Sequence, residues 1–527
     1  MKVVCCMLAA MLSVASLGGC VAPFPPELIA ENRDRVAEVL ADSYEEVINN
    51  YVDPVFASDL AVAGLRKMTQ LDPAMSLEVR AQDVSMSLQG ETFYSFAKPA
   101  AEDADGWGDA IAAALIAARD QSGQLRRHSE MRLLEDHMRG VAASLPREGR
   151  YSTDQEIRAL IFPQYNSGVQ FAFLRREGKL ILWRLDPDGR LEAAGLRKGD
   201  AVTHLNSLPV VDMTGRELSE QLMGPEGSKL TFTVLRRAEE WPIELEVARW
   251  RLRPVGSQLE QHGDVGILRM PYMTPQAIEE VAYRVEIDRA NEKHGGERLA
   301  GWILDLRGNL GSTDWVYLRL ANIFMGKGTV ATQSNHRLRP RKVINASWPD
   351  KSDNWPLVVL VDGMTSYGAE EVVAGLQDNG RAVVVGASTA GEGVVHTSLS
   401  LHKLGDIWLP VALSYAPSGY AFEGRGVLPD ICIAKGGSLQ SLLTSLRRGE
   451  GLPDLADRTR HIDLDDKVAL AAHRALCPLV PDPKTFDPAD TSAPEGDVAE
   501  RLALAILNDP DLYRRLLRRS PGLKDPG

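Results

Sequence analysis

The sequence predicts a multidomain α/β protein: a helical N-terminal module, a β-rich domain, an α/β core with a mixed sheet, and a helical C-terminal tail. Three observations predict this arrangement. Leu, Val and Ile recur at helical spacing in the first part of the 527 residues. The apolar period changes to two at about residue 164. From about residue 263, continuous Val/Ile/Leu runs alternate with helical segments, a pattern typical of buried, partly parallel sheets.

Residues 1–19 are expected to be a lipoprotein signal peptide. Lys2 gives a positive start, and an apolar core of about a dozen residues follows, which is too short to span a membrane. The closing "LGGC", ending at Cys20, resembles the bacterial lipobox, whose cysteine is acylated and becomes the mature N-terminus. The resemblance implies a lipid-anchored protein of the bacterial cell envelope. Val21 favours the periplasmic face of the outer membrane. An ordinary secretory signal with a chance cysteine is the alternative.

Residues 20–163 are expected to form the helical N-terminal module. Helical spacing extends to about Ser58 and returns from Ala110 to about Leu145. The stretch between them, which includes "GETFYSFAKPAAEDADGWGD", is polar and irregular. We therefore interpret it as one long insertion between helices.

Residues 164–240 resemble a PDZ domain. The most specific segment is "AAGLRKGD", Ala193–Asp200, which is similar to the "PAxxAGLxxGD" turn of bacterial PDZ domains. The resemblance implies a PDZ-like β-rich domain with an exposed sheet edge, where an extended peptide adds as a strand. It implies peptide-binding residues in the loop before the first strand: Ser167, Gly168, Val169 and Phe171. Because "QYNSG" departs from the usual Gly-rich apolar loop, capture of a C-terminal carboxylate is less expected than peptide binding. A domain used only for packing is the alternative.

Residues 241–434 are expected to form the α/β core, and residues 435–527 the helical tail, which the polar linker "PDPKTFDPADTSAPEGD" divides. Beyond the signal and Cys20, two cysteines remain, Cys432 and Cys477. In an oxidising compartment they form either a disulfide or two buried free thiols. The formal charge of −13 argues against a nucleic-acid partner. The sequence has no cluster of metal-ligand type, so neither a metal nor another cofactor is predicted.

Four segments of the core occur in one order: "LDLRGNLGS" from Leu304, "LVDGMTSYGAEEVVAGLQDNGRAVVVG" from Leu360, "TAGEG" from Thr389, and "YAPSGYAFEGRGVLPD" from Tyr415. Together with the PDZ-like domain before them, they resemble the C-terminal processing peptidases, also called tail-specific proteases. The resemblance implies a serine-type peptidase fold over about residues 164–434. It also implies that the Gly308–Gly311 loop supplies part of an oxyanion hole. A strand-ending turn without chemistry is the alternative for this loop.

The resemblance also implies a serine nucleophile and a lysine base, and this sequence departs from both. In the ungapped register, Tyr367 stands at the nucleophile position and Glu392 at the lysine position of "TxGKG". Ser366 is one residue away, which at a helix start turns a side chain by about 100°. Some relatives use a Ser-His-Glu arrangement, but the matching stretch here, "SLPREGRYSTDQE", has no histidine. His396 is the nearest histidine in sequence, and an ordinary strand residue is its alternative role.

Three hypotheses about activity stay open at this point. Conventional Ser-Lys catalysis conflicts with Tyr367 and Glu392. A rearranged serine-type site would use Ser366 as nucleophile, Glu392 or His396 in support, and Gly311 in the oxyanion loop. In a non-catalytic fold, Thr365 or Ser366 would cap a helix that carries two glutamates in its first turn, and Tyr367 would fill the cleft.

We predict a catalytically degenerate envelope lipoprotein that binds peptides or partner proteins. The partners predicted are an unfolded polypeptide or a protein C-terminus, an envelope protease or adaptor, and the membrane through the N-terminal lipid. The alternative is an active serine-type peptidase that cleaves unstructured C-terminal tails through Ser366. Binding of a small apolar ligand is a third class of function, which no feature of the sequence indicates.

Overall fold

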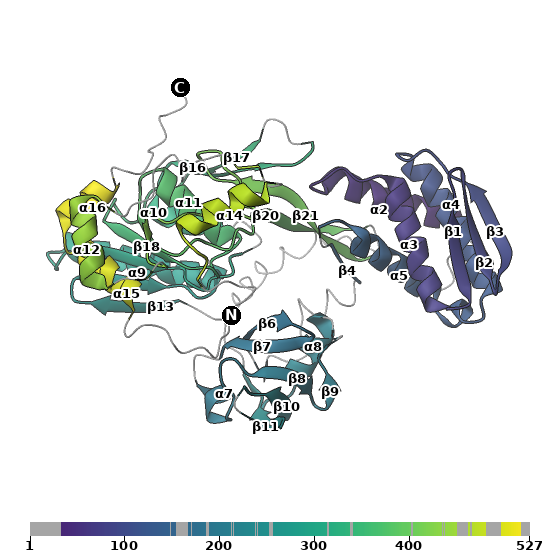
Figure 1. The fold of residues 1–527 in the computed structure, drawn as a ribbon, viewed down its shortest axis with the longest axis horizontal. Coiled ribbons are helices and arrows are strands. Elements are labelled where there is room, and N and C mark those ends of the chain that lie inside the picture. The colour runs from purple at the N-terminus through teal and green to yellow at the C-terminus, as the bar shows by residue number, and fades with distance from the viewer. Residues whose placement is uncertain are drawn as a thin grey trace, which may run out of the picture. The chain divides into compact units, whose positions relative to one another are not determined.

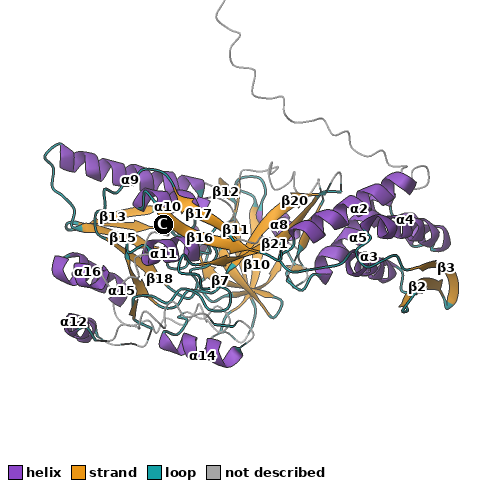
Figure 2. Cartoon of the chain, turned by 90° about the horizontal axis from the view of Figure 1, so that it is seen from above, coloured by secondary structure: helices purple, strands orange, loops and turns teal. Residues whose placement is uncertain are grey.

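The computed structural model describes residues 33–147, 149–153, 167–169, 171–185, 189–211, 213, 215–237, 239, 241–251, 257–312, 316–337, 341–401, 404–434, 436, 438–450, 462–463, 466–480 and 497–517 (Figures 1 and 2). The chain divides into two compact units. The first unit comprises Met1–Asn50, Pro54–Ile157 and Ser398–Leu409, and the second comprises the remaining segments. Each unit is described by itself. Within the described residues, no helix has the length and apolar character needed to cross a membrane.

The first unit combines helices with a small antiparallel sheet. Its helices are α2 (Arg33–Asn50), α3 (Ala57–Leu71), α4 (Ala104–Gln121) and α5 (Glu130–Ser144), and its sheet has the order β1 (Met75–Val79), β2 (Asp83–Leu88), β3 (Glu91–Ala97). Asp103 and Ser129 cap α4 and α5 by accepting backbone N–H groups with their side chains. The short strand β4 (Arg150–Ser152) pairs with the first residues of β21 (Asp406–Tyr415).

The sheet of the first unit corrects the interpretation of an irregular insertion. Strand β3 begins inside the stretch "GETFYSFAKPAAEDADGWGD", and Leu88 pairs with Glu91 across a two-residue turn. Gln89 and Gly90 both have positive φ, 54° and 89°, as a hairpin turn of type I′ requires. This turn brings the aromatic-rich strand back along β2. The insertion is therefore a β-meander that stays close to the helices, since Phe96 contacts Trp107 of α4 edge-to-face.

The β-rich domain forms one antiparallel sheet with the order β11-β10-β8-β7-β6. The strands are β6 (Ala172–Arg176), β7 (Lys179–Arg184), β8 (Ala201–Leu205), β10 (Lys229–Leu235) and β11 (Ile243–Ala248), with β9 (Leu208–Pro209) added to β8. Two helices, α7 (Arg190–Ala193) and α8 (Gly215–Leu222), accompany them, and β5 (Ser167–Gly168) pairs with β12 (Trp250–Arg251). Strand β11 pairs with β10, and β12 pairs with β5. The domain therefore extends past the predicted boundary at residue 240 to Arg251.

The predicted "AAGLRKGD" turn is tied down by one buried carboxylate. Asp200 is 1% exposed, accepts the N–H of Arg197 at 2.9 Å and forms an ion pair with Arg236 at 2.8 Å. The turn also needs φ values of 95° at Gly195 and 85° at Gly199, which glycine adopts without a Cβ penalty. The turn is therefore fixed by its local geometry and by the ion pair with Arg236, the residue directly after β10.

The core contains the predicted mixed sheet, in the order β13-β14-β15-β18-β19-β22. Strands β13 (Gln258–His262) and β14 (Val265–Arg269) are antiparallel, whereas β15 (Gly301–Asp305), β18 (Leu357–Val361), β19 (Val383–Gly386) and β22 (Ile431–Cys432) continue in parallel. Helices α9 (Pro275–Lys293), α10 (Val316–Phe324) and α11 (Gly368–Asp378) share one apolar cluster with one face of the sheet. The multidomain α/β prediction is confirmed, because apolar runs without alternation do form strands buried on both faces.

The helical tail covers the other face of this sheet instead of forming a separate region. The tail helices are α12 (Leu439–Arg448), α15 (Val498–Leu507) and α16 (Pro510–Leu517). They share an apolar cluster with the strand side chains that point to this face, such as Ile303 and Leu360. Tyr513 of α16 accepts the N–H of Leu357 at 3.0 Å with its hydroxyl. The tail is thus an integral layer of the α/β core.

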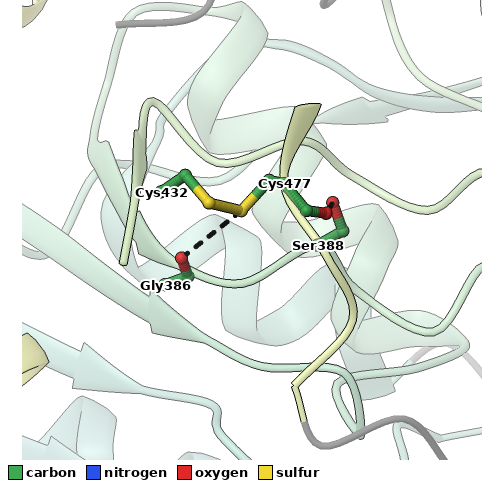
Figure 3. Close-up of a disulfide and its surroundings, with 4 residues drawn as sticks. All are labelled: Gly386, Ser388, Cys432 and Cys477. Carbon is green, nitrogen blue, oxygen red and sulfur yellow. Dashed lines mark hydrogen bonds between the residues drawn. A yellow bond between two sulfur atoms is a disulfide. The ribbon is translucent and has the colours of Figure 1, made fainter. Parts of the chain in front are cut away.

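Cys432 and Cys477 form a disulfide across a sequence separation of 45 residues. Figure 3 shows it between β22 and the segment after α14 (Lys467–Leu476). Ser388, which follows β19, donates its hydroxyl to the carbonyl of Cys477 at 2.6 Å. The disulfide is therefore formed, and the alternative of two free thiols is wrong.

A second sheet has the order β17-β16-β21-β20. Its strands are β16 (Gly328–Ser334), β17 (Lys342–Ala346), β20 (Val394–Ser400) and β21. β20 stands at one end of this order, so β21 is its one neighbour in the described sheet. Residues 394–397 of β20 belong to the same unit as the mixed sheet.

Candidate active site

Two loops follow the ends of the neighbouring parallel strands β15 and β18 and hold each other. Asp362 accepts the N–H of Gly308 at 2.9 Å, and Ser366 donates its N–H to the carbonyl of Asn309 at 3.0 Å. The hydroxyl of Thr365 donates to a carbonyl of the first loop at 2.9 Å. Because the ends of parallel strands meet at one edge of the sheet, residues 306–312 and 362–368 form one rigid rim there.

Tyr367 begins helix α11 in a backbone conformation that favours glycine. Its φ is 47° and its ψ is −131°, and Ala369 donates its N–H to the carbonyl of Ser366 at 3.1 Å. These values correspond to the first central position of a type II′ turn, which is normally glycine. The predicted capping by Thr365 or Ser366 is wrong: Tyr367 is the N-cap residue, and its side chain makes no capping hydrogen bond. A strained residue of this kind points to a site whose side chain is held out for a purpose.

Gly311 packs directly under this turn. A Cβ added to Gly311 would lie 2.3 Å from the carbonyl oxygen of Ser366 and 2.8 Å from the Cβ of Tyr367. Its φ of 73° also favours glycine. The expected role of the Gly308–Gly311 loop as a set of oxyanion donors is not supported, because Gly308 donates to Asp362 and Gly311 donates to the side chain of Asn309 at 2.7 Å.

Ser366 lies inside the rim. The residue is 3% exposed, and its hydroxyl has no hydrogen-bond partner within the described part of the chain. A serine nucleophile needs a base within about 2.6–3.2 Å of its oxygen. The described structure gives Ser366 no such base.

Glu370 of α11 fixes the loop that carries the predicted base position. Its buried carboxylate accepts the hydroxyl of Thr389 at 2.5 Å and the N–H groups of Gly391 at 2.8 Å and Glu392 at 2.9 Å. Burial raises the pKa of Glu370 to about 7, against the lowering effect of these three hydrogen bonds. Glu392 itself is exposed. Glu370 therefore positions the loop, and the side chain of Glu392 lies at its outer surface.

A pocket of about 360 Å³, which includes its open mouth, lies beside Tyr367. Tyr367 and His396 of β20 face each other edge-to-face in it, with ring centroids 6.1 Å apart. Burial lowers the pKa of His396, which favours the neutral imidazole. From the sequence, His396 is either a supporting group of a rearranged site or an ordinary strand residue, and the structure brings it to the pocket. The lining residues are Ser312, Tyr317, Tyr367, Gly368, Glu371, Gly393, Val394, Val395, His396, Ser414 and Phe422.

Of the predicted catalytic residues, Tyr367 lines this pocket, whereas Ser366, Glu392 and Gly311 are not among its lining residues. Gly311 lies just behind it, next to Ser312 and under the Cβ of Tyr367. The nucleophile position and the base position of the family pattern are therefore not brought together in one cavity here.

Sequence reasoning missed Glu371. Its carboxylate is 4% exposed, lines the pocket and accepts hydrogen bonds from the hydroxyls of Ser414 and Tyr317. Burial raises the pKa of Glu371. One signal in the sequence was available: "AEEVVAGL" sets two glutamates directly before an apolar stretch, and a charged residue inside a buried helix needs polar partners.

The residues predicted to bind peptide are engaged within the β-rich domain. Val169 donates its N–H to the carbonyl of Leu222, at the end of α8, at 3.1 Å. Ser167 donates its hydroxyl to the carbonyl of Gly224 at 2.6 Å, and Gly168 forms an isolated β-bridge with Met223. The donors expected to face a peptide therefore face the end of α8 in this conformation.

Phe171 packs into the same domain. Its ring lies 5.9 Å from the ring of Phe173 and 5.8 Å from that of Phe232, which is fully buried. Phe171 is partly buried and packs against the core of the domain. Cys20, the predicted lipidation residue, lies outside the described residues. In the part of the chain that is described, no group of three or more His, Cys, Asp or Glu side chains is placed to hold a metal ion.

Comparisons with known proteins agree with this architecture. Residues 264–433, which contain the pocket, match peptidase family S41. A carboxy-terminal-processing protease of Bartonella bacilliformis is 28% identical over 240 residues, which cover 46% of this chain and 55% of that protein. The carboxy-terminal processing protease CtpA of Bacillus subtilis is 25% identical over 319 residues, which cover 59% of this chain and 66% of that protein.

The fold is also similar to a solved structure, the photosystem II D1 C-terminal processing protease. The TM-score is 0.51 at 18% sequence identity, over 75% of this chain and 92% of that chain. The chain spans about half of the length of the Bartonella relative. Residues 264–433 therefore belong to peptidase family S41, and the chain is similar to carboxy-terminal processing proteases over about half of its length.

Proposed function

We propose that this protein is a catalytically degenerate member of its family, which binds an unfolded polypeptide or a protein C-terminus without cleaving it. One observation carries the proposal: the pocket presents Tyr367 on the strained turn, while the neighbouring Ser366 has a buried hydroxyl with no hydrogen-bond partner in the described residues. Acyl transfer by serine requires a base that removes the hydroxyl proton. The contacts of Ser366 support no such transfer.

The base position argues in the same direction. Glu392 is exposed, and it is a carboxylate where the family resemblance implies a lysine base. Glu370, the carboxylate closest to this loop, has all its described hydrogen bonds directed at the loop itself. These contacts fix the conformation of the loop, and none of them places a base at the hydroxyl of Ser366.

Binding is supported by an open sheet edge at the pocket. Residues 394–397 of β20 have β21 as their one neighbour in the described sheet, and Val394, Val395 and His396 line the pocket. An extended polypeptide can add to such an edge as a further strand and place a side chain in the adjoining pocket. The PDZ-like domain, residues 167–251, supplies a second edge at β6 and is proposed to contribute to polypeptide binding.

The proposal also places the protein in the bacterial cell envelope. "LGGC" at Cys20 supports lipidation there, and Val21 supports the periplasmic face of the outer membrane. A lipid-anchored, non-cleaving member would present polypeptides to an envelope protease or adaptor. The alternative, an active serine-type peptidase using Ser366, requires the rim around Asn309 to rearrange so that a base reaches the hydroxyl.

Incubation with an unstructured protein tests the proposal. The full chain, purified in detergent, would be mixed with β-casein beside the variants Ser366→Ala and Tyr367→Phe. Gel electrophoresis should reveal no cleavage by any of the three, and co-sedimentation should detect bound casein. Cleavage by the wild-type chain that Ser366→Ala removes would contradict the proposal and establish the rearranged serine site.

A further inference from the structure

We infer that the pocket beside Tyr367 accepts a positively charged group, an ammonium or a guanidinium, such as the end of a lysine or arginine side chain of a bound polypeptide. This inference rests on the proposed function, since it names the side chain that the same site takes. It depends on three features of the pocket: a buried carboxylate, a set of aromatic rings and the absence of a cation among the described lining residues.

The carboxylate belongs to Glu371. It is 4% exposed, and its partners in the described structure are the neutral groups of Ser414, Tyr317 and Gln333. These donors satisfy its oxygens without supplying a positive charge, so burial raises the pKa of Glu371, and a cation in the pocket would favour its ionised form. A buried carboxylate without a cationic partner is unfavourable, so a cation that enters the pocket gains an uncompensated charge as its partner.

The walls of the pocket suit a cation as well. Tyr317, Tyr367 and Phe422 contribute aromatic rings, whose faces attract a cation within about 6 Å of the ring centre. His396 opposes Tyr367 edge-to-face, and burial favours its neutral form, so it adds no repelling charge. None of the described lining residues is lysine or arginine.

Other occupants fit less well. An anionic group would lie beside Glu371 and be repelled. A neutral apolar group would remove the last water from Glu371 without supplying a charge in return. The pocket opens beside β20, whose edge can hold the backbone that carries such a side chain.

Small probes test the pocket without a polypeptide. The full chain in detergent would be titrated with n-butylammonium, n-butanol and n-butyrate at about pH 8, and the thermal unfolding midpoint would be followed, because a ligand that binds the folded state raises it. We expect a concentration-dependent rise with n-butylammonium only. Equal rises with all three probes, or a rise with n-butyrate alone, would overturn the inference.

Peptides link the pocket to polypeptide binding. Three fluorescent peptides, identical except for lysine, norleucine or glutamate at one central position, would be compared by fluorescence anisotropy. The lysine peptide should bind about tenfold more tightly than the norleucine peptide, a difference of about 1.4 kcal/mol. The glutamate peptide should bind most weakly.

Two substitutions separate a role in binding from a role in folding. Glu371→Gln should remove the preference for lysine and the response to n-butylammonium. Because this buried substitution can disturb folding, His396→Lys is the second variant: it adds a charge at the pocket and should weaken the lysine peptide at least tenfold. The matched control is His262→Lys, which adds the same charge at an exposed position of β13 that does not line the pocket and should leave binding within about twofold. Unchanged binding in His396→Lys would overturn the inference.

The outcomes distinguish the two proposals. Equal binding of all three peptides, without a selective response to n-butylammonium, would refute the cation pocket and leave polypeptide binding intact. A selective response to n-butylammonium without any peptide binding would support the pocket and contradict the proposed function.

Discussion

Tyr367 occupies a strained turn at the start of α11 and places a phenol where the family resemblance implies a serine nucleophile. The backbone holds the residue in a type II′ conformation against Gly311, as a nucleophile would be held, but the side chain is a phenol beside His396. The ungapped register with the family pattern puts Tyr367 at the nucleophile position, and in the structure Tyr367 lines the pocket. The register could not predict that the hydroxyl of Ser366 has no hydrogen-bond partner among the described residues, because the conformation of this turn depends on contacts with Asn309 from another loop.

Gly311 provides a test of this close packing. Gly311→Ala should lower the free energy of unfolding by about 3 kcal/mol or more, since the new Cβ would overlap the carbonyl of Ser366 and φ is positive. The matched control is Gly263→Ala, where φ is 61° and a Cβ would meet nothing within 4 Å. That control should lose only about 1–2 kcal/mol. Urea unfolding measures both, and equal losses would contradict the packing described for the rim.

Glu370 predicts a specific pH dependence of stability. Its pKa in the folded chain, about 7, exceeds the ordinary value of 4.5, so the folded state binds the proton more tightly than the unfolded state. Its contribution to stability is therefore full below about pH 4.5 and is lost as pH rises through about 7. A pKa difference of one unit corresponds to about 1.4 kcal/mol, so the stability lost over this pH range is up to about 3 kcal/mol.

Glu370→Gln checks this assignment. The amide cannot accept the N–H of Glu392 with its nitrogen, so the variant should be about 1–3 kcal/mol less stable at low pH. Between about pH 4.5 and 7, the unfolding free energy of the wild type should fall relative to that of the variant, so the stability advantage of the wild type should shrink. Urea unfolding at several pH values measures it, and a constant difference would show that Glu370 does not titrate in this range.

At the scale of elements, the sequence predicted those parts whose pattern is local. Continuous apolar runs predicted β14, β15, β18 and β19, and the helical period predicted α9 and α11. The β-meander of the first unit was missed, because Gln89-Gly90 is a weak turn signal and its aromatic strand does not alternate in burial. The place of the tail on the mixed sheet, and of β20 at the pocket, depends on contacts between segments that are far apart in sequence, which no local pattern contains.

The disulfide between β22 and the segment after α14 gives the prediction that belongs to this scale. Replacing both Cys432 and Cys477 by serine should lower the free energy of unfolding by about 4 kcal/mol, because the unfolded chain regains the freedom of a long closed loop. Urea unfolding with and without dithiothreitol measures the effect. The reductant should destabilise the wild type and leave the double variant unchanged; a reductant effect of the same size in both would contradict the assignment.

At the scale of the whole molecule, the proposed function combines a predicted membrane anchor with two proposed polypeptide-binding edges. The anchor is a prediction from "LGGC" and concerns residues outside the described structure. Metabolic labelling with a radioactive fatty acid tests it: the wild-type chain should carry label in the membrane fraction, and Cys20→Ala should carry none. Label that persists in Cys20→Ala would place the anchor elsewhere, and a wild-type chain without label would leave only a secretory signal.

The central claim is that this family member holds a polypeptide without cutting it. The most direct measurement is mass spectrometry of an unstructured peptide after prolonged incubation with the full chain, under conditions where anisotropy shows the peptide to be bound. The account predicts that the peptide is recovered with its mass unchanged. Fragments that together carry one added water, formed by the wild-type chain and absent with Ser366→Ala, would contradict it and make the pocket an active site.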